Sequence, residues 1–386
     1  GIILTLLLVL FSLSGIVLNH RQTFSKISID RKYLHKEYRY KNWNIASIKE
    51  MYALSPDSVL MYGNVGIWLT DSTLSEFKDF NAGFPDGVDY RKTFKVLEYR
   101  GHLYAGTLYG FYRYDRLTQQ WQLINLPIKE LNVVDIEIRD ETMLVLTRSH
   151  LLSSDDGQNF TEIELPAPEG YDNKVGLFKT LWVIHSGEIY GQIGILVVDL
   201  IAVITIFLSI TGLILYISKE KIKKNKNNRK LKQKHLKRIK WNLKWHNKIG
   251  WTTALFLIIT TTTGVFLRPP LLAAIFKTNV GKIPYTELDT PNPWYDNLRR
   301  IIYLPENDIY VFSTYDAFYY SPDEFETMIK FENQPPASVM GVTVLEDLGE
   351  NTLLIGSFEG LFEWNYHTGY VFDAMKKEVY VAPKKT

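Results

Sequence analysis

Residues 245–267 read WHNKIGWTTALFLIITTTTGVFL, a mostly apolar run that begins next to a histidine. From residue 249 onward it contains no charged side chain, and a helix that crosses a bilayer needs about 20 predominantly apolar residues. Two further runs of this kind lie at 1–19 and 185–217. Three such runs are too many for buried helices of a soluble protein, and helices satisfy their own backbone in lipid. The sequence therefore predicts an α-helical membrane bundle with spans at 1–19, 185–217 and 246–268.

The connection between the second and third spans is strongly basic. Fourteen Lys or Arg residues and one acidic residue lie within 219–248. Positive residues in short connecting loops stay on the cytoplasmic side. We therefore expect 218–245 to be a cytoplasmic loop, and 20–184 and 269–386 to lie in the periplasm, outside a bacterial inner membrane. Nucleic-acid binding by the basic tract is disfavoured, because the topology already explains the charge.

The two segments outside the spans contain a repeated β pattern. A strand, a tight turn and a second strand recur around Gly66, Gly110 and Gly360, with looser copies at 143–154 and 310–321. The first two copies are 44 residues apart, and four-stranded propeller blades repeat every 40–45 residues or so, about the same step. We predict all-β periplasmic domains with propeller-like blades, which form either one composite propeller or two partial sheets. Two unrelated β-sandwich or meander domains are the alternative.

The composition excludes several kinds of site. The chain has no cysteine, which rules out disulfides, thiolate zinc sites, cysteine-ligated iron–sulfur clusters and covalently attached c-type heme. No P-loop, no Gly-x-Gly-x-x-Gly after a strand and no nucleophile motif occurs, so the chain shows no nicotinamide or flavin site. A reductase built on this chain would draw electrons from a quinol or from a partner protein.

Three passages resemble the PepSY-associated transmembrane helix family, whose helices open on patterns similar to His-x-x-x-Gly and His-x-Gly-x-x-x-Gly. They are WHNKIG at 245–250 with Thr263-Gly264, IHSGEIYG at 184–191 with Thr211-Gly212, and SGIVLNH at 14–20. The resemblance implies, for some members, an inner-membrane protein that binds heme b and reduces a periplasmic ferric siderophore. No PepSY domain is recognisable outside the membrane, where the β repeats take its place. This departure bears on the substrate more than on the membrane core.

Three histidines near span ends are the candidate heme ligands. Heme b in a helical bundle takes axial nitrogens from facing helices. We expect His185 at the outer end of the second span and His246 at the inner end of the third, and assign both as iron ligands. About 30 Å of bilayer separates these ends, so the two histidines cannot share one iron. His20, at the outer end of the first span, is a further cofactor-binding candidate that could pair with His185.

The ligand partners of His185 and His246 are also open to a second interpretation. The chain begins inside an apparent span, so we expect further residues before Gly1 and a fourth span after Thr386. These segments would then supply the partner histidines. The alternative for all three candidates is a histidine that caps a helix end at the membrane surface.

The remaining polar signals are weaker. Asp199 lies inside the second span, and an intramembrane acid is a functional candidate by default. We expect the other histidines to be solvated in loops or blades; they are His35, His102, His150, His235 and His367. The sequence identifies no catalytic residue.

Two functions remain open from the sequence. The first is a heme-binding protein that carries electrons across the membrane to a periplasmic acceptor such as a ferric siderophore. The second is a non-enzymatic subunit of an envelope complex, whose propeller-like domain docks a partner protein while the spans anchor it in the bilayer. Function does not follow from a fold of this kind.

Overall fold

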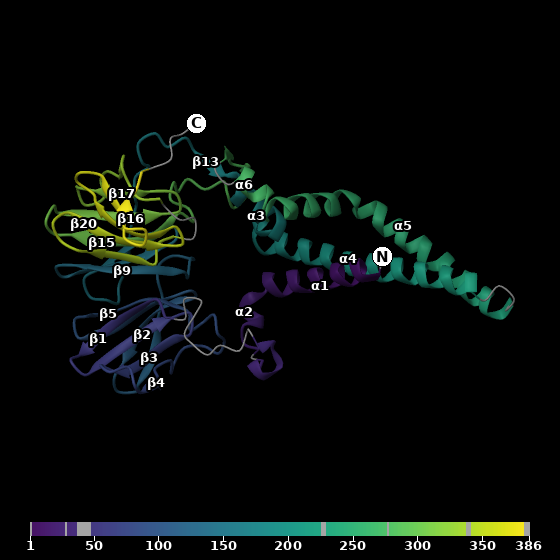
Figure 1. The fold of residues 1–386 in the computed structure, drawn as a ribbon, viewed down its shortest axis with the longest axis horizontal. Helices are drawn as coiled ribbons and strands as arrows, with labels where there is room; N and C mark the ends of the chain where they lie inside the picture. The colour runs from purple at the N-terminus through teal and green to yellow at the C-terminus, as the bar shows by residue number, and fades with distance from the viewer. Residues whose placement is uncertain are drawn as a thin grey trace. The chain divides into compact units, whose positions relative to one another are not determined.

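The chain divides into two compact units, which are coloured along the chain in Figure 1. The helical unit consists of Gly1–Phe24 and Asp172–Thr290, and the β unit consists of Ser25–Tyr171 and Pro291–Thr386. The second helical segment therefore interrupts the β unit in sequence, while the two β segments belong to one unit in space. This computed structural model describes residues 2–27, 29–36, 48–224, 229–275, 278–336 and 341–381.

Within the part of the helical unit that the structure describes, three helices are long and apolar enough to cross a membrane. They are α1 (Ile2–Asn19), α4 (Gly191–Lys224, which the 3-10 helix η3, Glu188–Tyr190, precedes) and α5 (Arg229–Phe266). Helix α4 packs against both α1 and α5. No side chain of α1 is buried, and few of α4 and α5 are, as expected of helices whose apolar faces meet lipid. The prediction of a membrane protein with three apolar helices is confirmed.

Shorter elements flank the long helices. They are α2 (Arg21–Phe24), α3 (Leu177–Ser186), α6 (Leu271–Ile275), and the paired strands β13 (Lys174–Gly176) and β14 (Asn279–Gly281). Helix α3 ends at Gly187, which adopts a left-handed conformation with φ of 87° and turns the chain into η3. A Cβ at Gly187 would also lie 2.2 Å from the Gly194 carbonyl oxygen, so the turn packs directly on the first residues of α4.

The basic tract between the apolar runs is largely helical. Helix α4 continues to Lys224 and α5 begins at Arg229, so both helices extend through residues expected to form a loop. At 1.5 Å per residue, their 34 and 38 residues span about 51 and about 57 Å. The hydrocarbon core is only about 30 Å thick, so the lysine-rich ends extend beyond the length that lipid requires. Lysine, arginine, leucine and glutamine are good helix formers, which explains the extension.

Among its described residues, the β unit contains five antiparallel sheets, each formed by strands that follow one another in the sequence. The first three are β1 (Glu50–Ser55), β2 (Ser58–Gly63), β3 (Gly66–Asp71) and β4 (Phe77–Asp79); β5 (Thr93–Tyr99), β6 (His102–Thr107), β7 (Gly110–Asp115) and β8 (Gln120–Ile124); and β9 (Val133–Arg139), β10 (Thr142–Thr147), β11 (Leu151–Ser154) and β12 (Thr161–Ile163). The last two are β15 (Leu298–Leu304), β16 (Ile309–Thr314), β17 (Phe318–Ser321) and β18 (Ile329–Lys330); and β19 (Val344–Asp347), β20 (Thr352–Ser357), β21 (Gly360–Asn365), β22 (Tyr370–Asp373) and β23 (Glu378–Val379). A 3-10 helix, η1 (Arg31–Tyr33), precedes them.

The predicted strand–turn–strand repeats form the central hairpin of each sheet. Gly66, Gly110 and Gly360 are the first residues of β3, β7 and β21. The two looser copies are in register as well, because Met143 pairs with Ser154 and Tyr310 pairs with Ser321. The all-β prediction is therefore confirmed, while no closed barrel or closed propeller is found among the residues that the structure describes.

Apolar clusters join each sheet to the next in chain order. The first and second sheets share a core around Leu60 and Tyr112, and the second and third share one around Tyr104 and Val145. The fourth and fifth share a cluster that includes Trp364. Burial of such side chains stabilises by about 25 cal/mol per Å² of apolar surface, so the sheets are held mainly by these shared cores.

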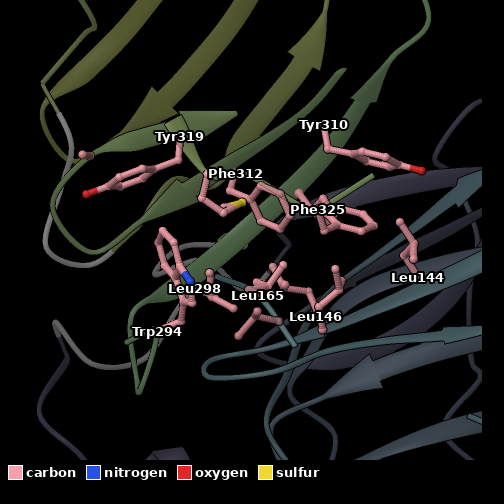
Figure 2. Close-up of a cluster of buried hydrophobic side chains, with 14 residues drawn as sticks. Leu144, Leu146, Leu165, Trp294, Leu298, Tyr310, Phe312, Tyr319 and Phe325 are labelled. Carbon is pink, nitrogen blue, oxygen red and sulfur yellow. The ribbon is translucent and has the colours of Figure 1, made fainter. Parts of the chain in front are cut away.

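The third and fourth sheets pack together although the whole inserted helical segment separates them in sequence. Figure 2 shows Leu144 and Leu146 of the third sheet facing Phe312 and neighbouring aromatic side chains of the fourth. The indole N–H of Trp294 also donates to the Pro166 carbonyl oxygen at 2.9 Å, across the same junction. The segment that carries α4 and α5 is thus inserted into one β unit, whereas α1 precedes that unit in sequence.

Candidate functional site

His185 lies at the end of α3 and faces α5. Its Nδ1 atom is 3.0 Å from the carbonyl oxygen of Thr260 and 3.1 Å from the hydroxyl oxygen of Thr263. The next residue on α5 is Gly264, where an added Cβ would lie only 2.9 Å from Cε1 of the ring. The imidazole therefore occupies space that only a glycine leaves open on this helix.

His246 repeats this arrangement on another pair of helices. Its Nδ1 atom, on α5, is 2.9 Å from the hydroxyl oxygen of Thr211 on α4. Gly212 follows, and an added Cβ there would lie 3.6 Å from Cε1 of the ring, an ordinary van der Waals distance. Each histidine thus contacts a Thr-Gly pair on a neighbouring helix. The glycine lies closer to the ring of His185 than to the ring of His246.

The hydrogen bonds assign the proton on each imidazole. The hydroxyl of Thr263 donates its one proton within its own helix, to the Ile259 carbonyl at 2.8 Å, and that of Thr211 donates to the Phe207 carbonyl at 2.9 Å. Both hydroxyl oxygens are then left to accept, and a carbonyl oxygen can only accept. Nδ1 therefore carries the proton in His185, and we assign the same tautomer to His246, so that Nε2 holds the lone pair in each ring.

The two histidines contact α5 at separate positions. His246 belongs to α5 itself, and His185 bonds to Thr263, which is 17 residues further along the helix. At 1.5 Å per residue the two positions are about 26 Å apart along the helix axis. This separation approaches the thickness of the hydrocarbon core, about 30 Å.

His20 is held differently. Its Nε2 atom is 2.5 Å from the Oδ2 atom of Asp199 on α4, so the nitrogen that the other two histidines leave open is engaged here. The neighbouring Asn19 amide donates to the other carboxylate oxygen of Asp199 at 3.1 Å and to the Ser186 carbonyl at 3.3 Å. These contacts connect α1 to α3 and α4. They also give the Asp199 carboxylate polar partners within the helical unit.

The structure corrects one expectation about the remaining histidines. His235, on α5, is only 4% exposed and is therefore not solvated. Asn242, seven residues further along the same helix, is buried as well. Seven residues are two helical turns, so both share one face of the helix. That spacing was visible in the sequence. His35, His102 and His367 are exposed, and His150 pairs with Glu162 at 2.5 Å between Nδ1 and Oε1.

A buried charge network in the β unit was not predicted from the sequence. The Arg300 Nε atom is 2.7 Å from Oδ2 of Asp135, Nη2 is 3.6 Å from Oε2 of Glu50, and Nη1 donates to the Thr343 carbonyl at 3.0 Å. Lys95 bonds to the other Glu50 oxygen at 2.5 Å. The four charged residues lie in the first strands of four sheets, and Thr343 lies just before the first strand of the fifth.

The environment of this network moves several pKa values. Burial opposes the charge of Arg300, but the carboxylates of Asp135 and Glu50 outweigh it and raise the pKa of the guanidinium. Burial, with Lys92 and Arg300 nearby, lowers the pKa of Lys49 to about 7. Burial also raises the pKa of Glu137 to about 7, with Asp135 adding to the effect. A partial signal for the network exists in the sequence, since Lys95, Asp135 and Arg300 interrupt the otherwise apolar first strands of three repeats.

Within the described residues, no three or more His, Asp or Glu side chains come together as a metal site. The imidazoles of His185 and His246 are nevertheless suited to a metal that is otherwise held by its own macrocycle. An iron porphyrin needs only axial nitrogens from the protein, and Nε2 of each ring has the lone pair that such a bond requires.

Comparisons with solved structures found distant likenesses. The extracellular domain of a hybrid two-component system from B. thetaiotaomicron matches 88% of this chain at 9% identity and a TM-score of 0.41, and 29% of that domain is covered. The extracellular domain of a one-component system from the same organism gives 84%, 9% and 0.40, with 27% covered. The computationally designed Ika8 protein gives 89%, 10% and 0.35, with 67% covered. The chain thus spans less than a third of the two natural domains, and TM-scores this low carry no argument.

A search of the curated proteins found no match. The match to a protein family is of another kind, because it covers the elements that carry the Thr-Gly pairs and both candidate histidines. The description of that family is PepSY-associated TM region, and its sequence model matches residues 146–354, just over half of the 386 residues. The chain belongs to the PepSY-associated transmembrane family.

Proposed function

We propose that this protein is a heme-binding electron carrier of the bacterial cytoplasmic membrane, which passes electrons to a periplasmic acceptor such as a ferric siderophore. The observation that carries the proposal is the matched arrangement of His185 and His246. Each ring has Nδ1 bonded to a neighbouring helix and the lone pair of Nε2 left for another bond. Neutral imidazole held in this way is the usual axial ligand of heme in helical proteins.

His185 and His246 would each hold one heme b through Nε2. Bound heme supplies reversible one-electron chemistry between ferric and ferrous iron. The protein's own contribution is to orient the two imidazoles and to surround them with apolar helices that exclude water.

The spacing of the two histidines supports transfer across the bilayer. The positions where they meet α5 are about 26 Å apart along the axis, against a hydrocarbon core of about 30 Å. The two imidazoles are therefore placed to hold a heme near each membrane face, where the heme would supply one-electron chemistry on both sides of the apolar layer.

We propose that the basic ends of α4 and α5 face the cytoplasm and that the β unit lies in the periplasm. The lysine-rich extension supports this orientation, since positive residues are retained on the cytoplasmic side. Cysteine labelling of intact cells tests it. A membrane-impermeant thiol reagent should label Asp115→Cys or Asn365→Cys and should miss Asn227→Cys, and labelling of the last variant would reverse the proposed orientation.

We also propose that the five sheets stand as propeller-like blades. The shared apolar cores between successive sheets support this arrangement, as does the network around Arg300, which joins the first strands of four sheets and the residue before the first strand of the fifth.

Visible absorption of the purified full chain is the decisive experiment. The proposal predicts a Soret band and, after reduction with dithionite, a sharp α-band. His185→Ala and His246→Ala should each lose one of two hemes and keep the other, while His102→Ala, which alters an exposed ring on the β unit, should keep both. Helical circular dichroism of each variant confirms folding.

The same experiment separates the alternative function. A folded wild-type protein that is colourless after expression with added heme precursor, and that binds no added hemin, contradicts the proposal. The chain would then be better described as an envelope subunit that docks a partner through its β unit.

A further inference from the structure

The two histidine sites are built from the same parts but depend on different ones. Both rings rest on a Thr-Gly pair of a neighbouring helix, Thr263-Gly264 for His185 and Thr211-Gly212 for His246. We infer that the threonine is the residue that fixes the ring of His246, whereas the glycine is the residue that admits the ring of His185. This inference rests on the proposed function for the identity of the metal group and on the geometry for everything else.

The hydroxyl of Thr211 is the only acceptor that the structure gives to Nδ1 of His246 among the described residues. That hydroxyl accepts from the ring because its own proton goes to the Phe207 carbonyl. Without it, a neutral imidazole in an apolar bundle has no reason to keep its proton on Nδ1, and the ring is free to rotate or to exchange tautomers. Nε2 would then carry the proton in part of the population and could not bind iron.

His185 has a second acceptor that no side-chain substitution removes. The Thr260 carbonyl lies 3.0 Å from Nδ1, slightly closer than the Thr263 hydroxyl at 3.1 Å. A carbonyl oxygen accepts only, so it holds the same tautomer by itself. Loss of the Thr263 hydroxyl should therefore leave the orientation of His185 nearly unchanged.

The glycines reverse this order of dependence. A Cβ at Gly264 would lie 2.9 Å from Cε1 of His185, with Nδ1 at 3.4 Å and Nε2 at 3.6 Å, so an added methyl group would displace the whole ring. A Cβ at Gly212 would lie 3.6 Å from Cε1 of His246, which is normal contact. Alanine should consequently be tolerated at Gly212 and not at Gly264, and the two glycines control for each other.

Thr211 and Gly264 are thus positioning residues, since neither is assigned contact with the iron. Partners of a metal-ligating histidine typically contribute 10–100-fold in metal affinity, or about that range. The expected pattern is crossed: Thr211→Val weakens only the His246 site, and Gly264→Ala weakens only the His185 site. The reciprocal changes, Thr263→Val and Gly212→Ala, have little effect on either.

The test uses the full chain in detergent, with one site left in each background. In the His185→Ala background, hemin titration followed by Soret absorbance should show that Thr211→Val lowers affinity about 10–100-fold, while Thr211→Ser, which restores a hydroxyl, returns it to near the parent value. Gly212→Ala in the same background should change affinity less than about threefold, since the added methyl group makes only normal contact. In the His246→Ala background, Gly264→Ala should abolish binding and Thr263→Val should not.

A second measurement does not depend on heme. Nitrogen-15 NMR of histidine-labelled, heme-free protein reports the tautomer of each ring, and His246 should show a protonated Nδ1 that is lost in Thr211→Val and regained in Thr211→Ser. If wild type binds no heme but shows this tautomer pattern, the positioning role stands and the proposed function fails. If wild type binds two hemes and Thr211→Val leaves both affinity and tautomer unchanged, or Gly212→Ala is as damaging as Gly264→Ala, the inference is wrong and the proposed function stands.

Discussion

The helical unit and the β unit treat polar side chains in opposite ways. In the helical unit, His185 and His246 each bond through one ring nitrogen and keep the other available. In the β unit, the Arg300 guanidinium contacts the carboxylates of Asp135 and Glu50 and donates to a backbone carbonyl. Lys95 bonds to the other oxygen of the Glu50 carboxylate. The two imidazoles are thus oriented for a further bond, whereas the charged groups use their bonding capacity within the fold.

The physical reason lies in what each unit must satisfy. A neutral imidazole can remain in a bundle with a single hydrogen bond, which is worth about 1 kcal/mol between membrane helices. A buried charge cannot, because removal from water costs several kcal/mol unless opposite charges and hydrogen bonds surround it. We therefore regard the Arg300 network as structural and the two histidines as functional.

Substitution of Arg300, the central residue of the charge network, tests this difference most directly. Arg300→Met leaves the Asp135 carboxylate, with 1% of its side chain exposed, without its main partner, and we expect a loss of about 3–5 kcal/mol in unfolding free energy of the β unit. Urea unfolding of the full chain in detergent, followed by tryptophan fluorescence, measures it. Heme content should not change while the protein remains folded.

Arg116→Met is the matched control for this substitution. Its partner is Glu98 at 3.6 Å, and 61% of the arginine side chain is exposed, so the change should cost less than about 1 kcal/mol. Equal costs for the two variants, or selective loss of heme from a folded Arg300→Met protein, would contradict the division between a structural network and a functional bundle.

The pH dependence of stability gives a smaller effect in the same network. The carboxyl of Glu137 keeps its proton up to a pKa of about 7 in the folded chain, against an ordinary value of 4.5. Between these values the folded state binds more protons than the unfolded state, so stability falls as the pH rises from 4.5 to 7. Glu137→Gln should remove about 2 kcal/mol of this fall, measured by urea unfolding at several pH values.

Lys49 does not mask this slope. Its pKa of about 7 lies below its ordinary 10.5, so it makes stability rise with pH only above pH 7. Exposed Glu359→Gln is a suitable control and should leave the profile unchanged. A slope between pH 4.5 and 7 that survives in Glu137→Gln would show that this carboxyl is ionised in the folded protein.

The last prediction concerns Asp199, whose polar contacts in the helical unit resemble those of the charged groups in the β unit. We expect the smallest effect here. His20 and Asn19 both bond to Asp199, as charges do in the β unit, and this makes them anchors of α1. Asp199→Asn should weaken the docking of α1 on α4 by about 1 kcal/mol, seen as easier unfolding in sodium dodecyl sulfate. The heme content should not change, and loss of one heme in Asp199→Asn or in His20→Ala would support His20 as a heme ligand.

Much of the architecture could be predicted from local patterns. The apolar runs predicted α1 and the membrane-crossing parts of α4 and α5, because lipid demands length and the absence of charge. Tight turns between short apolar strands predicted the central hairpin of every sheet. The basic tract is largely helical where a loop is expected, because lysine-rich sequence has high helix propensity as well as charge. His235 was misplaced for the same reason.

The sequence by itself determined which residues enter lipid, which strands pair with their neighbours and which histidines stand near span ends, because each depends on side chains close together in the chain. Only the tertiary structure decided that His185 meets Thr263, that His246 meets Thr211 and that Arg300 meets Asp135. Those partners are 35 to 165 residues apart. Such contacts depend on how whole helices and sheets pack, and the position of an atom within hydrogen-bonding reach is fixed by that packing rather than by any local pattern.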